Sequence, residues 1–123
     1  ANSFNEVILL ACSDETTDLT TGTEKVTFRC PFAFTITGVS ASVSTAPVGS
    51  TIICDINEAG TTILSTKLSI DASEKTSTSA ASAVVVSDTT IAADAEITVD
   101  IDQIGSSTAG KGLKVKLDGY RTA

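Results

Sequence analysis

The chain has 123 residues, with 15 acidic and eight basic side chains and no histidine, and its formal net charge at pH 7 is −7. An acidic chain lacks the clustered Lys and Arg that nucleic acids and anionic membranes attract, which argues against both as partners. Because histidine is missing, a Ser-His-Asp or Cys-His nucleophilic site cannot be built from this chain alone.

The length is that of a single domain, and it is sufficient to bury a core without disulfides or metals. The hydrophobic fraction is 41% and only 4% of residues are aromatic. Abundant Thr, Val and Ile favour pleated sheet over helix. The apolar run from Val7 to Ala11 is too short to span a membrane and lacks the basic flank of a signal peptide.

The first half of the chain reads as short strands. Residues 6–11 form the first, and residues 14–22 form a loop or a short edge strand. Alternation then runs from Lys25 to Thr37, with Pro31 at a bend because it has no N–H to donate. After Gly38 the apolar phase reverses, which predicts a bulge at that glycine. The apolar positions before and after the reversal are Val26, Phe28, Cys30, Phe32, Phe34 and Ile36, and then Val39, Ala41 and Val43.

A turn at residues 46–49 leads into a strand over residues 50–57. Its alternation places Ile52, Cys54 and Ile56 in the core, whereas Asp55 and Asn57 face solvent. A turn at Gly60 and short strands over residues 62–65 and 68–70 follow.

In the last third, residues 75–83 predict a loop or edge strand, residues 84–86 a short buried strand, and residues 87–94 a loop from which Ile91 enters the core. Residues 95–104 and 113–118 alternate as strands around the flexible loop 105–112, interpreted as a long hairpin tip. If those strands pair antiparallel, the first carries aspartates opposite lysines of the second: Asp100 and Asp102 opposite Lys114 and Lys116.

Short strands separated by turn signals predict an all-β, single-domain antiparallel β-sandwich with a jelly-roll-like connection. Within it we distinguish an N-terminal strand and loop over residues 1–21, which could act as an arm, from a β-sandwich module over residues 22–123.

The cysteines are three in number, so they cannot all pair, and no CxxC motif suggests zinc. Cys30 and Cys54 share the phase of apolar neighbours and are expected to be small buried hydrophobes. All three cysteines, including Cys12, are expected to be reduced thiols.

Three other groups of residues have side chains that could support chemistry. Asp100 and Asp102 could bind calcium together with Asp55 or Asn57, but a solvated acidic face is the simpler interpretation. The segment GSSTAGKG (105–112) lacks the spacing of a phosphate-binding loop. The scattered carboxylates lack the aromatic platforms that usually accompany glycoside hydrolysis. We therefore predict no catalytic residue, cofactor, metal or small-molecule substrate.

Two aromatic residues are the candidates for a subunit contact. Phe4 lies in a polar N-terminal segment that could dock on a neighbouring subunit or a larger surface, although a frayed terminus would look the same. Tyr120 stands near the C-terminus and could serve the same purpose.

Residues 22–121 resemble a family of β-sandwich modules found in structural proteins of tailed bacteriophages, including phages of cyanobacteria. The motifs that carry the resemblance are Pro31-Phe32, Thr45-Ala46-Pro47-x-Gly49-Ser50, Asp55-Ile56-Asn57, Ile63-Leu64-Ser65, Asp94-Ala95-Glu96-Ile97 and Asp102-Gln103-Ile104-Gly105. The cysteines stand where such modules usually have aliphatic residues.

The resemblance implies a virion protein without catalytic residues. A small acidic module of this kind resembles a capsid decoration (cement) protein, which would form a homotrimer, bind the major capsid protein on the outer capsid surface and be synthesised in the host cytoplasm. The alternative is a tail-fibre or receptor-binding module that recognises a host surface glycan, and a carbohydrate-active enzyme is a third, less favoured possibility.

Overall fold

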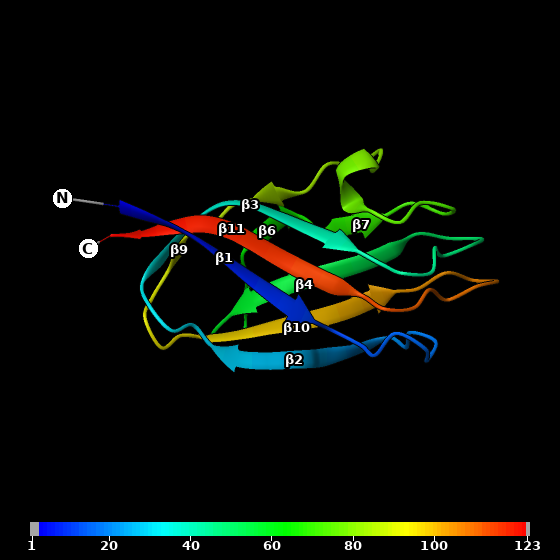
Figure 1. Cartoon of the computed structure of the whole chain (residues 1–123), viewed down its shortest axis with the longest axis horizontal. Helices are drawn as coiled ribbons and strands as arrows, with labels where there is room; N and C mark the ends of the chain where they lie inside the picture. The colour runs from blue at the N-terminus through cyan, green and yellow to red at the C-terminus, as the bar shows by residue number, and fades with distance from the viewer. Residues whose placement is uncertain (1–2, 123) are drawn as a thin grey trace.

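The computed structural model describes residues 3–122, and two antiparallel sheets packed face to face make up most of it (Figure 1). Sheet A has the strand order β1-β11-β3-β9, and sheet B has the order β2-β10-β4-β5, with β7 also paired to β4. A separate ladder joins β6 to β8. The antiparallel β-sandwich predicted from the sequence is therefore confirmed, whereas the jelly-roll-like connection stays a prediction.

The strands have the following bounds: β1 (Ser3–Ala11), β2 (Gly22–Arg29), β3 (Phe34–Ser42), β4 (Ile52–Glu58), β5 (Thr61–Thr62), β6 (Leu64–Thr66), β7 (Leu68–Ile70), β8 (Val85–Val86), β9 (Thr90–Ile91), β10 (Glu96–Gln103) and β11 (Lys114–Thr122). A single 3₁₀ turn, η1 (Ser77–Ser79), is the one helical element among residues 3–122.

The core lies between the sheets and consists mainly of aliphatic side chains, as strand alternation requires. Ile91 enters it from β9 as predicted. The expected inward phases of β4, β10 and β11, with Leu113 just before β11, are also confirmed, because all of these residues are buried: Ile52, Cys54, Ile56, Ile97, Val99, Ile101, Leu113, Val115 and Leu117. The strand predicted at residues 84–86 is present as Val85–Val86, but the prediction that it is buried is wrong, because 49% of the Val85 surface is exposed.

The last two long strands do not pair with each other, which corrects the expected hairpin. β10 lies between β2 and β4, while β11 lies between β1 and β3, so residues 104–113 cross from sheet B to sheet A. The expected aspartate–lysine pairs between β10 and β11 are therefore absent within residues 3–122. The same side chains pair locally instead: Asp102 with Lys67, Lys114 with Glu15, and Lys116 with Asp118.

The bulge predicted near Gly38 is present. Asp118 of β11 lies opposite Gly38, but the next residue, Gly119, lies opposite Ile36, so Thr37 is the extra residue in β3. Gly119 continues the inward phase of β11, and a Cβ added there would lie 2.7 Å from Cζ of Phe34 and would collide with the carbonyl oxygen of Thr35. This glycine therefore leaves the room that the Phe34 ring occupies.

The N-terminal segment is part of the sandwich over the residues that the structure describes. β1 pairs with β11 without interruption from Ser3↔Thr122 to Ala11↔Lys114, so residues 3–11 form an edge strand and not a separate arm. The first two residues of the expected arm, residues 1–2, lie outside the described residues. Residues 14–21 form a loop. Between residues 3 and 122, no helix has the length and apolar character needed to cross a membrane.

Candidate interaction surfaces

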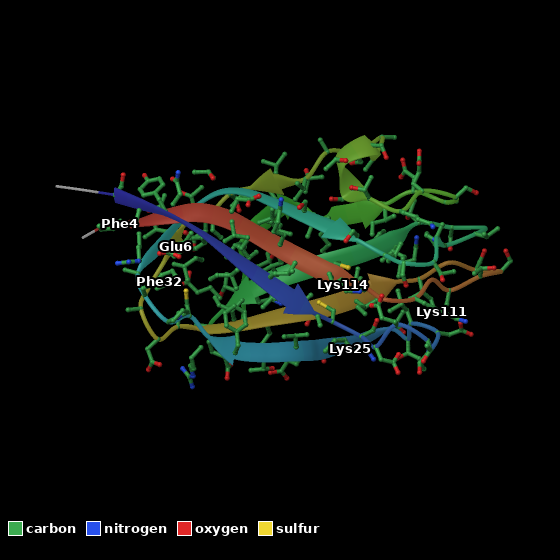
Figure 2. The ribbon with its side chains drawn as sticks, in the orientation of Figure 1. Phe4, Glu6, Lys25, Phe32, Lys111 and Lys114 are labelled. Carbon is green, nitrogen blue, oxygen red and sulfur yellow. The ribbon has the colours of Figure 1, made fainter. Side chains whose placement is uncertain are left out.

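Phe4 packs against its own chain at the end of the sandwich where the termini lie (Figure 2). The guanidinium carbon of Arg121 is 4.7 Å from the centroid of the Phe4 ring and 5.7 Å from that of Phe32. The Nε of Arg121 donates to Glu6 at 2.7 Å. A cation between two aromatic rings, paired with a carboxylate, fixes the two terminal strands to each other. Phe4 still keeps 42% of its surface exposed.

Tyr120, the other predicted contact residue, does not share a patch with Phe4. Phe4 lies opposite Arg121, whereas Tyr120 lies opposite Asn5 on β1 and Thr35 on β3. Because side chains alternate along a strand, Phe4 and Tyr120 project from opposite faces of sheet A. Tyr120 is half-buried on the outer face. The structure therefore places both residues at the same end of the sheet without joining them into one surface.

The largest exposed aliphatic side chains lie on the outer face of β1, and the sequence reasoning missed them. Val7 is 60% exposed and Leu9 is 66% exposed, while Ile8 and Leu10 turn inward and pack on the core. The continuous apolar run Val7-Ile8-Leu9-Leu10 indicates them, because a strand with one solvated face normally alternates apolar and polar residues. An unbroken apolar run places apolar side chains on both faces of the strand.

A second surface is the loop tip, defined here as residues 44–50 together with residues 104–112. The N–H of Val48 donates to the Thr108 carbonyl at 2.9 Å, and the N–H of Ser107 donates back to the Val48 carbonyl at 3.0 Å. Thr45 and Lys111 likewise exchange two backbone hydrogen bonds, each 3.2 Å long. The expected flexible loop 105–112 is thus bonded along its length to a second loop.

Two glycines allow the backbones of the loop tip to approach closely. Gly49 has a φ of +93°, which L-residues rarely adopt, and a Cβ there would collide with Oγ of Ser106. A Cβ on Gly105 would lie 2.9 Å from the Val48 nitrogen and would also meet the Thr108 carbonyl. The loop tip is therefore a fixed structure, and it presents Val48 with 42% of its surface exposed.

Two of the family-like motifs meet in the loop tip. Ser50 closes the motif that begins at Thr45, and its hydroxyl donates to the carbonyl of Ile104, at 2.7 Å, in the motif that ends at Gly105. The amide of Gln103 in the second motif donates to the Thr51 carbonyl at 2.9 Å. Motifs that lie about fifty residues apart in the sequence therefore build one local structure.

The possible calcium ligands do come together, but around a lysine. Asp55 lies opposite Asp100 in the ladder, and the Asn57 amide donates to Asp100 at 3.0 Å. The Lys67 ammonium is 2.7 Å from Asp102 and 3.9 Å from Asp55. Its hydrogen bond with Asp102 raises the pKa of Lys67. No group of three or more acidic, Cys or His side chains within residues 3–122 could hold a metal ion.

Asp55 is buried, which corrects the expectation of a solvated carboxylate. Its Oδ1 accepts hydrogen bonds from the Ile56 N–H and from the Thr62 hydroxyl. The sequence pattern placed Asp55 outward on β4, and the segment that returns through Thr62 and Lys67 then covers that side of the sheet. Asp55 therefore serves to hold this segment against β4.

All three cysteines are buried and free, which confirms the expectation for Cys30 and Cys54. Burial raises the pKa of Cys12 to about 11 and also raises that of Cys30 and of Cys54. Because the thiolate is the reactive form, these thiols are unsuited to act as nucleophiles in the folded protein.

No family model, curated protein or solved structure matches the chain significantly. The family resemblance therefore rests on the motifs in the sequence itself.

Proposed function

We propose that this chain is a structural protein of a tailed-bacteriophage virion that binds the outside of the capsid and stabilises the lattice between major capsid subunits. Its role is non-enzymatic and needs no cofactor. The observation that carries the proposal is the loop tip, because two motifs of the family resemblance converge there on an exposed Val48. This surface is the proposed contact with the major capsid protein.

The geometry of the loop tip suits binding to a repetitive surface. Its backbone is already ordered by hydrogen bonds such as Val48 N–H to Thr108, so little conformational entropy remains to be lost on contact. A protein that binds only the assembled shell shifts the equilibrium toward that shell by mass action. A modest contact is sufficient for this purpose because it is repeated across the lattice.

We also propose the jelly-roll-like connection. It is supported by the strand orders β1-β11-β3-β9 and β2-β10-β4-β5, in which the chain alternates between the sheets from β1 to β4 and again from β9 to β11. Jelly rolls occur in viral capsid proteins and in lectins, so this topology is compatible with a glycan-binding tail module as well. Only a binding experiment separates the two roles.

The test uses two matched variants, Val48→Asp in the loop tip and Val85→Asp on β8. Both replace a valine that is about half exposed with an aspartate. Expanded capsids that lack this protein would be mixed with each purified chain, and co-sedimentation and the temperature of capsid disruption would be measured. We expect the wild-type chain and Val85→Asp to bind and to raise that temperature, and Val48→Asp to bind at least about tenfold more weakly.

Circular dichroism would first establish that both variants are folded. The proposal fails if the wild-type chain does not bind capsids or leaves their heat resistance unchanged. Equal binding by the two variants would leave a capsid role standing but would remove the loop tip as the contact. Binding to host envelopes or to a glycan array, without capsid binding, would instead establish the tail-module alternative.

A further inference from the structure

β1 is a long sheet edge that lacks the usual protection against pairing with another strand. Among residues 3–122, the other terminal strands of the two sheets are short or irregular: β9 and β5 have two residues each, and β2 has a register shift and a positive φ of 52° at Glu24. β1 has nine residues in unbroken register and contains no Pro or Lys. Exposed edges without bulges, Pro or Lys are strong templates for strand pairing.

The free backbone groups of β1 can be assigned from the ladder. The N–H of Cys12, just beyond β1, donates to the Leu113 carbonyl at 2.8 Å, in continuation of the β1–β11 register. Hydrogen-bonded and non-hydrogen-bonded pairs alternate in an antiparallel ladder, so the even-numbered residues of β1 bond to β11. The odd-numbered residues, including Val7 and Leu9, therefore direct their N–H and C=O groups toward the open edge.

This edge carries no net charge although the chain as a whole carries −7. Glu6, the one charged residue of β1, is paired with Arg121. On the adjacent outer face, Lys116 and Asp118 lie opposite Leu9 and Val7 and pair with each other at 3.6 Å. Two copies of the chain can therefore approach at β1 without bringing unpaired charges together.

We propose that β1 pairs antiparallel with β1 of a second copy of this chain, about a two-fold axis at Ile8. In this register Val7 of each copy lies opposite Leu9 of the other, and both are residues whose backbone groups point outward. The four exposed side chains form one apolar patch on the outer face, and Ile8 meets its counterpart on the inner face. A copy of β1 is the preferred occupant because it matches the edge in length, polarity and charge.

The contact joins sheet A of one protomer to sheet A of the next. Because it is two-fold, it closes a dimer, in place of the homotrimer that the family resemblance implies. The inference does not depend on capsid binding, since the loop tip and β1 are separate surfaces.

The test is the oligomeric state in solution, measured by sedimentation equilibrium over a wide range of concentrations. The wild-type chain would be compared with Val7→Lys/Leu9→Lys on β1 and with the control Thr23→Lys/Thr27→Lys on β2, which adds the same charge at exposed positions of the other long edge. Amide hydrogen exchange by NMR would report on β1 directly.

We expect the wild type and the control to dimerise, and the β1 variant to dissociate at least about tenfold more readily because it places lysines opposite each other. In the dimer the outward-pointing amides of the odd-numbered β1 residues, those of residues 7 and 9 above all, should be protected, and these should lose protection selectively in the β1 variant. A wild type that is monomeric or trimeric overturns the proposal. So does a dimer that survives the β1 substitutions with rapid exchange at Val7 and Leu9.

Discussion

Gly119 gives the sharpest test of the packing between β11 and β3. Substitution Gly119→Ala adds a Cβ that would lie 2.7 Å from Cζ of Phe34 and would collide with the Thr35 carbonyl. The Thr35 oxygen belongs to the backbone, so relief requires the strands to separate or the Phe34 ring to move. Overpacking of this kind costs about 1–3 kcal/mol. At about 4 °C per kcal/mol for a domain of this size, Tm should fall by about 4–12 °C.

The matched control is Gly38→Ala, on the other side of the same bulge. A Cβ at Gly38 would meet nothing within 4 Å, and its φ is not among the positive values. We expect it to be neutral or to stabilise by up to about 1 kcal/mol, because alanine restricts the unfolded chain. Urea and thermal unfolding followed by circular dichroism measure both. The reasoning is refuted if Gly119→Ala is as stable as the wild type, or if both substitutions cost the same.

Two further predictions concern buried polar and thiol groups. Asp55→Ala leaves the Ile56 N–H and the Thr62 hydroxyl without their acceptor, so the free energy of unfolding should fall by about 1–3 kcal/mol. Asp102→Ala, which removes only an exposed partner of Lys67, should cost less than about 1 kcal/mol, and equal losses in urea denaturation would contradict this account. At alkaline pH, folded Cys12 keeps its proton up to about pH 11, whereas an unfolded cysteine loses it near its ordinary pKa of 9.0. The stability from this thiol is complete below pH 9 and is lost as the pH rises to about 11, with a slope of up to about 1.4 kcal/mol per pH unit. In Cys12→Ala that slope should be smaller, and an unchanged slope between pH 9 and 11 would exclude Cys12 as its source.

The alternation of apolar and polar residues predicts the strands best where one face is buried and the other is exposed to solvent. Ile97, Val99 and Ile101 on β10 show this pattern and are all buried. The bulge beside Gly38 is also predictable, because a phase reversal is visible in the sequence itself. Alternation and its reversal are local features, so the sequence of one strand is sufficient to predict them.

Strand partners are not local, and there the sequence reasoning failed. The sequence pattern pairs Asp100 with Lys114 because the long strands that carry them follow one another, yet the chain changes sheet between them. The predicted strand position of Asp55 is correct, but the predicted exposure to solvent is wrong, because nothing near Asp55 in the sequence shows that the segment of Thr62 covers it. Burial that depends on a returning segment requires the tertiary structure.

The position of β11 has a consequence for how the protein folds. This strand is the last in the chain, yet it lies between β1 and β3 and is the only strand that joins them within the described residues. Until β11 leaves the ribosome, β1 and β3 have no shared partner, so sheet A cannot assemble during synthesis of the earlier strands. Pairing residues near opposite ends of the chain, such as Ser3 and Thr122, is a slow step because a long loop must close first. Sheet A is therefore expected to form cooperatively and only once β11 is available, with β11 closing the sandwich.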